Sequence, residues 1–483
     1  MSTVHMNVDR ETVRAAAIAV GVEPSEETLD RLVSQVRTTT EQVDRFEPSV
    51  PEAEPAAAVR EGTDEYNAFA YEFETGDGTG ALDDLTLAVK DNTAVSGVPM
   101  TCGSDAVAFT PTYDSTVVRR LKEGGATVVG TTNMDEFALT TTGETCAHGP
   151  VENPVVEGRV PGGSSSGSAA AVAAGLVDAA LGSDTGGSVR IPAAWCGVVG
   201  LKPTHRSVSR FGFADLAPSL DHVGPLAPSV ETACRVFDEI DGPDVHDPST
   251  HVSRPPSNVR TAVGQPVDDL SVAVVEEAMS QTEPAVRSCV RETIETLESA
   301  GVSVATVSLP AFPEMSHAAL TVANTEFAAL FASGGQVRGT GTGHAEPWRE
   351  AVASIDRSDL GEDVRSSLVV YESLYRATDG ANYVAAQNER RRFVQSVFEF
   401  LADTDALVMP TTTMAPPEFG EVTDTADVLA TIANTAPFNL TGHPALSVPC
   451  GAVDGAPVGL QLVADWHEEP VLARLGSAVE AAD

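Results

Sequence analysis

The pattern of hydrophobic and polar positions changes its period near residue 85. Residues 8–46 carry apolar side chains at helical spacing, and Pro24-Ser25-Glu26 marks the start of a second helix within them. From Leu85 onward, short apolar runs alternate with helical segments and with Gly/Pro turns. The predicted strands cover 85–91, 126–132, 302–309 and 406–412, and the predicted helices between them include 115–123 and 283–299. This alternation predicts an α/β protein in which helices pack on a sheet.

Polar segments predict where the chain divides. Residues 47–63 contain three prolines and no apolar periodicity, which is typical of a linker. We therefore expect an N-terminal helical extension with its linker over 1–63, followed by the main part of the chain over 64–483. The polar, proline-rich residues 241–265 predict a surface excursion. Length alone favours about three domains.

The composition restricts the solvent and the partners of the chain. Its 483 residues hold 70 Asp and Glu against 29 Lys and Arg, a net charge of −41. Such a negative field repels phosphate backbones and anionic headgroups, so we expect no direct contact with nucleic acid or with a membrane surface. Dense carboxylates keep a protein hydrated in multimolar salt, which screens their repulsion, so the composition predicts a halophilic source. A hydrophobic content of 42% excludes a disordered chain.

The remaining compositional features predict a cytoplasmic protein without a metal or cofactor. The chain opens without a basic and then apolar leader, and it has no run of 18 apolar residues. The six cysteines are scattered without a CxxC pair, which favours free buried thiols. The ten histidines show no metal-binding spacing.

The segment 160–175, VPGGSSSGSAAAVAAG, joins a Gly/Ser cluster to an Ala-rich helical stretch. One interpretation is a flexible loop that serines cap before a helix. A phosphate-binding loop is disfavoured because no Gly-Lys-Ser/Thr follows. Residues 163–167 match GxSxG, but a nucleophile elbow requires a buried strand directly before it, and here Pro161-Gly162 and polar residues precede it.

A second segment, 181–197, contains Thr185-Gly186-Gly187-Ser188. Consecutive backbone N–H groups of such a turn can surround one small space, because glycines let the backbone approach a ligand closely. An oxyanion hole requires this arrangement, and each well-aimed donor contributes roughly 10²–10³ in rate. The alternative is a serine that caps a helix after a Gly-Gly turn.

A nucleophilic serine needs a base, and one lysine is a candidate. Only three of the 29 basic residues are lysines, namely Lys90, Lys122 and Lys202. Lys90 ends the apolar run LTLAVK, where burial disfavours the ammonium and lowers its pKa. Arginine could replace lysine wherever only charge is needed, but its guanidinium does not deprotonate in proteins. Lys90 is therefore the candidate base, against the alternative of a surface cation.

These segments together resemble the amidase signature family. The resemblance rests on AVKDN with GVPMTCGS, on TTNMDEFA, on PGGSSSGSAAAVAAG and on GSDTGGSVRIPAAWCGVVGLKPT. SLDHVGPLAPSVE and PFNLTGHPALSVPCG extend it, so that it covers roughly residues 80–475 in consistent order. It implies a single large α/β/α catalytic domain on a mixed sheet, in place of three domains.

The resemblance also implies a Ser–Ser–Lys triad. Lys90 is then the base, Ser164 the bridging serine on a cis peptide, and Ser188 the nucleophile. The N–H groups of Thr185, Gly186, Gly187 and Ser188 would hold the oxyanion, and Asp184, Arg190 and Ser165 would support the loops. One position departs from the family pattern, because Ser166 replaces a glycine; a positive φ there would strain the loop.

Two subgroups of the family remain possible. NMDEFA and GVVGLKPT resemble the glutamine-hydrolysing subunit of the glutamyl-tRNA(Gln) amidotransferase, which passes ammonia to a partner subunit. Its glutamine pocket typically uses an Asp and an Arg, and our placement puts Ile432 and Ser366-Ser367 at those positions. The N-terminal helices and AVSGVPMTCGS instead resemble stand-alone amidases, in which such helices often help form a homodimer. We therefore expect a free-standing amidase for neutral, apolar small-molecule amides, with the glutaminase subunit and its partner subunits as the alternative.

Overall fold

The computed structural model describes residues 8–43, 52–75, 78–251, 258–334 and 346–482. Contacts between residues divide the chain into two compact units, Met1–Pro51 and Glu52–Asp483. Within the described ranges, no helix is long and apolar enough to cross a membrane.

The first unit is a pair of helices, α1 (Arg10–Ala19) and α2 (Glu26–Val43). The Asp9 side chain caps α1 by accepting a hydrogen bond from the backbone N–H of Thr12. The second helix begins directly after Ser25, at the predicted start signal. A small apolar cluster joins the two helices and consists of Val8, Val13, Leu29 and Val33.

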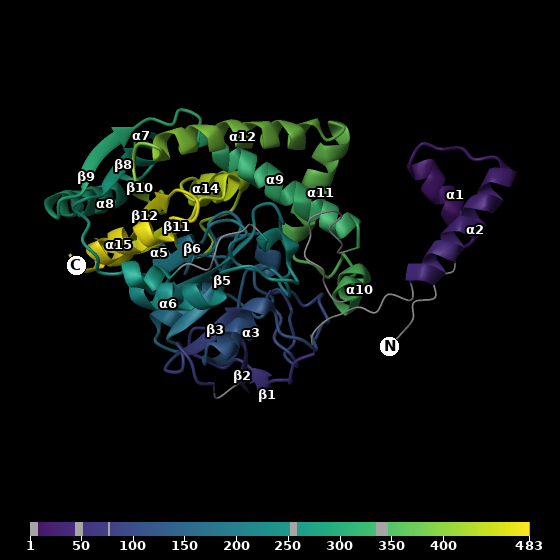
Figure 1. The fold of residues 1–483 in the computed structure, drawn as a ribbon, viewed down its shortest axis with the longest axis horizontal. Coiled ribbons are helices and arrows are strands. Elements are labelled where there is room, and N and C mark those ends of the chain that lie inside the picture. The colour runs from purple at the N-terminus through teal and green to yellow at the C-terminus, as the bar shows by residue number, and fades with distance from the viewer. Residues whose placement is uncertain (1–7, 44–51, 76–77, 252–257, 335–345, 483) are drawn as a thin grey trace. The chain divides into compact units, whose positions relative to one another are not determined.

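Among the described residues of the second unit, twelve strands form one mixed sheet. Figure 1 shows how this sheet runs through the unit. The strands are β1 (Ala57–Glu61), β2 (Phe69–Thr75), β3 (Thr86–Lys90), β4 (Thr127–Thr132), β5 (Ala179–Asp184), β6 (Val199–Lys202), β7 (His222–Ala227), β8 (Ser271–Val275), β9 (Ser303–Val307), β10 (Ala406–Pro410), β11 (Ala445–Val453) and β12 (Ala456–Ala464). Their order across the sheet is β1-β2-β4-β3-β5-β7-β6-β11-β12-β10-β8-β9. The predicted α/β class and the large mixed sheet are therefore confirmed.

Helices flank this sheet or pack on the helices that do. They are α3 (Thr116–Glu123), α4 (Ser166–Ala173), α5 (Arg190–Cys196), α6 (Val230–Ile240), α7 (Glu276–Ser280), α8 (Pro284–Ser299), α9 (Phe312–Ala332), α10 (Glu346–Ser354), α11 (Glu362–Ala377), α12 (Ala381–Leu401), α13 (Thr425–Ile432), α14 (Ala436–Thr441) and α15 (Glu469–Glu480), with the 3-10 turns η1 (Glu136–Ala138), η2 (Pro248–Thr250) and η3 (Val259–Ala262). The alternation of side chains along β3 shows two separate cores, because Leu87 and Val89 join one buried cluster and Ala88 joins another.

Two segments differ from the sequence prediction. Residues 57–61, placed in the predicted linker 47–63, form the edge strand β1, which pairs antiparallel with β2. Residues 47–51 of that linker lie outside the described residues, and the domain boundary at residue 63 stays a prediction. The excursion 241–265 is described except for 252–257, and it packs closely enough to bury Asp244, Asp247 and Val259.

Candidate active site

The candidate residues meet at the carboxyl edge of parallel strands. β3 pairs parallel with β5, and Lys90 and Asp184 are the last residues of these two strands. Carboxyl ends of parallel neighbours lie at the same edge of a sheet, so the two strand ends come close although they are far apart in the sequence. Each serine-rich segment leads directly into a helix. Helix α4 packs on β3 and β5, and α5 packs against α4 and on β6, β11 and β12.

Lys90 is fully buried and contacts two hydroxyls. Its Nζ donates to Ser164 Oγ at 2.7 Å and to Ser183 Oγ at 2.9 Å. Ser183 also accepts a hydrogen bond from Asn92 Nδ2 at 3.2 Å. Burial lowers the pKa of Lys90 to about 7, although Asp135, Asp184 and Asp221 act to raise it. A substantial fraction of this amine is therefore neutral near pH 7.

The loop that carries Ser164 is fixed against β5 and against Ser188. The peptide bond between Gly163 and Ser164 is cis. Ser165 Oγ donates to the carbonyl oxygen of Ser183 and accepts from its N–H, at 3.1 and 3.2 Å. The N–H of Ser165 donates to the carbonyl oxygen of Ser188 at 3.3 Å. Through these bonds the structure brings Lys90, Ser164, Ser165 and Ser188 to one place.

The turn 185–188 presents its backbone N–H groups without internal partners. Gly187 has a φ of 136°, and a Cβ there would lie 2.2 Å from Thr435 Oγ1, so only glycine fits. Thr435 Oγ1 in turn donates to the carbonyl oxygen of Gly186 at 2.6 Å. No acceptor in the described part of the chain takes a hydrogen bond from the N–H groups of residues 185 to 188. These donors are free to bind a developing oxyanion.

Asp184 and Arg190 form a buried pair beneath the turn. Arg190 Nε and Nη2 donate to the two carboxylate oxygens of Asp184, at 3.0 and 2.8 Å. Burial would raise the pKa of Asp184, but the Arg190 guanidinium, with smaller contributions from Lys202 and Asn439, lowers it to about 2. Arg190 also donates to Gln461 Oε1 and Asn439 Oδ1, both at 2.7 Å. The turn is thus anchored to β12 and α14.

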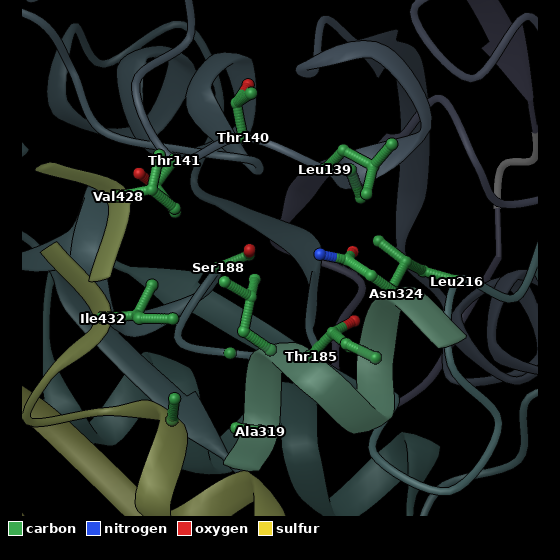
Figure 2. A pocket seen from close by; sticks show the side chains of 15 residues that line it. Leu139, Thr140, Thr141, Thr185, Ser188, Leu216, Ala319, Asn324, Val428 and Ile432 are labelled. Atoms are coloured by element: carbon green, nitrogen blue, oxygen red, sulfur yellow. The ribbon is translucent and has the colours of Figure 1, made fainter. Parts of the chain in front are cut away.

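Ser188 lines a pocket above this machinery (Figure 2). The pocket has a cavity volume of about 40 Å³. In Figure 2 the Ser188 hydroxyl and the Asn324 amide project into the same space, and Val428 and Ile432 form the opposite wall. The polar side chains among its fifteen lining residues are Thr140, Thr141, Thr185, Ser188 and Asn324. None of the lining residues, all of which the structure describes, is an acid or a base.

The substitution at Ser166 does not strain the loop. Ser166 is the first residue of α4 and is absent from the described non-glycine residues of positive φ. Its hydroxyl is buried and has no hydrogen-bond partner in the described part of the chain. Ser166 therefore lowers the stability of the fold through a buried hydroxyl without a hydrogen bond, and not through backbone strain.

Several residues of the site were not predicted from the sequence, namely Asn92, Ser183, Asn439 and Gln461. Ser183 and Asn92 lie within the segments GSDTGGS and AVKDN, so proximity to a candidate residue was the available signal. Gln461 carries no local signal, because its role depends on a contact with Arg190, 271 residues away along the chain. In the described residues, no group of three His, Cys, Asp or Glu side chains could hold a metal ion.

Comparisons with known proteins agree with this geometry. A family model described as Amidase matches residues 38–472. The A subunit of glutamyl-tRNA(Gln) amidotransferase from Natronomonas pharaonis, a halophilic archaeon, is 45% identical over 86% of this chain and 99% of that protein. The crystal structure of the same subunit from Thermotoga maritima has a TM-score of 0.73 at 33% identity, covering 94% of this chain and 92% of that one. Native peptide amidase from Stenotrophomonas maltophilia has a TM-score of 0.69 at 30% identity, covering 83% of each chain.

The halophilic relative agrees with the high-salt origin that the composition predicts. The family model spans the cis serine, the buried lysine and the Gly-Gly turn described above. The chain therefore belongs to the amidase signature family of carbon–nitrogen hydrolases.

Proposed function

We propose that the chain hydrolyses a carboxamide through an acyl-Ser188 intermediate and releases ammonia. The observation that supports it most strongly is the 2.7 Å contact between Lys90 Nζ and Ser164 Oγ, beneath the pocket that Ser188 lines. Neutral Lys90 accepts the proton of Ser164 while Ser164 takes the proton of Ser188. Ser188 Oγ then attacks the amide carbon, and the N–H groups of residues 185–188 bind the oxyanion.

The second half of the reaction uses the same groups in reverse. Ser164 donates a proton to the leaving nitrogen as the C–N bond breaks, and Lys90 returns a proton to Ser164. Water then attacks the acyl-enzyme and releases the carboxylic acid, with Ser188 regaining its proton. The reaction needs no group beyond amide, water and these side chains.

Ammonia release in multimolar KCl tests this chemistry. We expect activity in the unchanged protein and a loss of about 10⁴-fold or more in Ser188→Ala, because the covalent route then disappears. A Ser188→Ala protein that retains most of the activity would contradict the assignment.

For the amide itself, the relatives favour glutamine. The 45% identity to a glutamyl-tRNA(Gln) amidotransferase subunit, over 99% of that protein's length, supports a glutaminase subunit that passes ammonia to a partner subunit. This function is the alternative that NMDEFA and GVVGLKPT predict, and it has more support from the relatives than a free-standing amidase has. It predicts glutaminase activity that rises when the partner subunits are added.

The pocket supports a second candidate, a hydrolase of neutral amides. Ile432 lines the pocket where our placement expects the Asp that pairs with glutamine, whereas Ser366 is exposed on α11 and does not line it. An amino-acid zwitterion needs charged partners, because burying each of its charged termini without one costs several kcal/mol. The deciding measurement is kcat/KM for glutamine, benzamide and hexanamide, with and without partner subunits. The control is Ile432→Asp, which adds one carboxylate; a rise for glutamine alone would favour the neutral-amide assignment of the unchanged chain.

A further inference from the structure

One carboxylate outside the triad contacts the oxyanion turn. β5 and β7 are antiparallel, with Asp184 opposite His222, so Thr185 and Asp221 form the next pair beyond the strands. Thr185 Oγ1 donates to Asp221 Oδ1 at 2.6 Å. Both residues are buried, with Thr185 6% exposed and Asp221 1% exposed.

The other oxygen of Asp221 holds the backbone of a neighbouring part of the pocket wall. Asp221 Oδ2 accepts from the N–H groups of Leu216 and Ala217, at 3.0 and 2.9 Å. Thr185 and Leu216 both line the pocket beside Ser188. A single carboxylate therefore fixes the distance between the turn and that wall.

The turn has few other side-chain anchors. Gly186 and Gly187 carry no side chain, and a Cβ at Gly186 would have its nearest neighbours only at 4.0 Å. Besides the Thr185 contact, this backbone is held by the bond from Thr435 Oγ1 to the carbonyl oxygen of Gly186, by the bond from the N–H of Ser165 to the carbonyl oxygen of Ser188, and by the buried pair beneath the turn. Burial raises the pKa of Asp221 to about 7, and its ionised form accepts all three hydrogen bonds at once. An amide in its place can keep both backbone bonds only if it donates to the Thr185 hydroxyl, which then no longer donates to residue 221.

We propose that Asp221 is a positioning residue for the oxyanion turn and acts through the Thr185 hydroxyl. By holding Thr185 against the Leu216 wall, it aims the N–H groups of residues 185–188 at the carbonyl oxygen that Ser188 attacks. This inference rests on the proposed acyl-Ser188 chemistry.

Four variants test it, with kcat, KM and the Ki of phenylboronic acid as readouts. The boronic acid forms a tetrahedral adduct on Ser188 that requires the oxyanion donors, so it reports their aim. Thr185→Val keeps the volume of the side chain and removes its hydroxyl. Asp221→Asn replaces one acceptor oxygen by a donor. Thr185→Ser is the conservative variant, because it keeps the hydroxyl and removes only the methyl group. Thr116→Val is the matched control, because Thr116 Oγ1 donates to the buried Asp244 at the same 2.6 Å, with both residues outside the set that lines the pocket.

We expect Thr185→Val and Asp221→Asn to lower kcat about 10- to 100-fold and to raise the boronic acid Ki by a similar factor, with KM within about threefold. Thr185→Ser should return both values to within about threefold of the unchanged protein. Thr116→Val should lower the thermal midpoint and leave kcat and Ki within about twofold.

Two results would overturn the inference in distinguishable ways. If the unchanged protein hydrolyses amides and Thr185→Val keeps its kcat and Ki, the positioning role alone is wrong. If the unchanged protein neither hydrolyses amides nor binds the boronic acid, the acyl-Ser188 chemistry is wrong and the inference falls with it.

Discussion

Lys90 and Lys202 are both fully buried, but their amines have different hydrogen-bond partners. Lys90 Nζ contacts the hydroxyls of Ser164 and Ser183. Lys202 Nζ contacts the carbonyl oxygens of Pro203 and His443, at 3.1 and 2.5 Å, and His222 Nε2 at 3.2 Å. His222 Nδ1 faces the carbonyl oxygen of Asp184, so Nδ1 carries the ring proton and Nε2 accepts.

The difference in hydrogen-bond partners decides which lysine can lose its proton and then act as a base. Burial lowers the pKa of both. Three acceptors around Lys202 need all three protons of its ammonium, whereas hydroxyls can either accept or donate. Lys90 can therefore lose a proton without leaving a partner unsatisfied, and Lys202 cannot. The partners of a buried amine, rather than its burial, separate a base from a structural cation.

The largest effect on activity is expected when Lys90 is replaced. We expect Lys90→Met to lower kcat/KM by about 10³–10⁴, because the general base is lost. Its thermal midpoint should fall only slightly, since Ser183 keeps its contact with Asn92 and a single hydroxyl, that of Ser164, loses its partner. Lys90→Arg should be equally inactive, because a guanidinium does not deprotonate. Activity retained in Lys90→Arg would remove lysine from the role of base.

Replacing Lys202 should have the opposite signature. Lys202→Met leaves two carbonyl oxygens and a histidine nitrogen without their donor, which should lower the free energy of unfolding by about 2–4 kcal/mol. The folded fraction should keep its kcat within about tenfold. Denaturant titration in multimolar KCl, followed by an assay of the folded enzyme, measures both. A stable but inactive Lys202→Met protein would show that the two lysines are not separated as described.

The pH dependence sharpens the comparison, because of the two lysines only Lys90 takes part in the proposed proton transfer. Protonated Lys90 is inactive and its pKa is about 7, so kcat/KM should rise about tenfold per pH unit below 7 and level off above it. The profile of Lys202→Met should keep this midpoint. A flat profile between about pH 5 and 8 in the unchanged protein would contradict a titrating Lys90.

The same comparison can be made between two buried hydroxyls, those of Ser164 and Ser166. Here we expect the smallest of the predicted effects. Ser164 has Lys90 as its partner, whereas the buried Ser166 hydroxyl has none among the described residues. Ser166→Ala removes the unsatisfied group at the start of α4 and should raise the free energy of unfolding by about 1 kcal/mol without changing kcat. Ser166→Gly is the control, because it also removes the hydroxyl but adds backbone freedom in a helix.

The parts of the fold that local patterns encode could be predicted from the sequence. The apolar runs that end at Lys90 and Thr132 are real strands, because a buried parallel strand is apolar throughout. Strand β7, HVGPLA, was not predicted because its Gly and Pro disrupt the pattern, although all six of its residues are buried. Its placement comes from pairing with β5, which no local signal shows.

The candidate site divides in the same way. Motifs singled out Lys90, Ser164 and Ser188, whereas the roles of Ser183 and Asp221 depend on strands that lie side by side only in the folded chain. The segment GLKPT resembles a turn, yet its Lys202 is fully buried where β6 pairs with the start of β11. Polar residues whose partners are distant in sequence have no local pattern by which to be found.

The anchoring of Arg190 by Gln461 and Asn439 has a consequence for the order in which the site forms during synthesis of the chain. These contacts join positions 271 and 249 residues apart, so they form late in any folding sequence. A chain emerging from the ribosome exposes Lys90, Ser164 and Ser188 long before the strand that steadies the turn has been synthesised. The turn 185–188 can thus reach its final anchoring only in a chain that has been synthesised through β12.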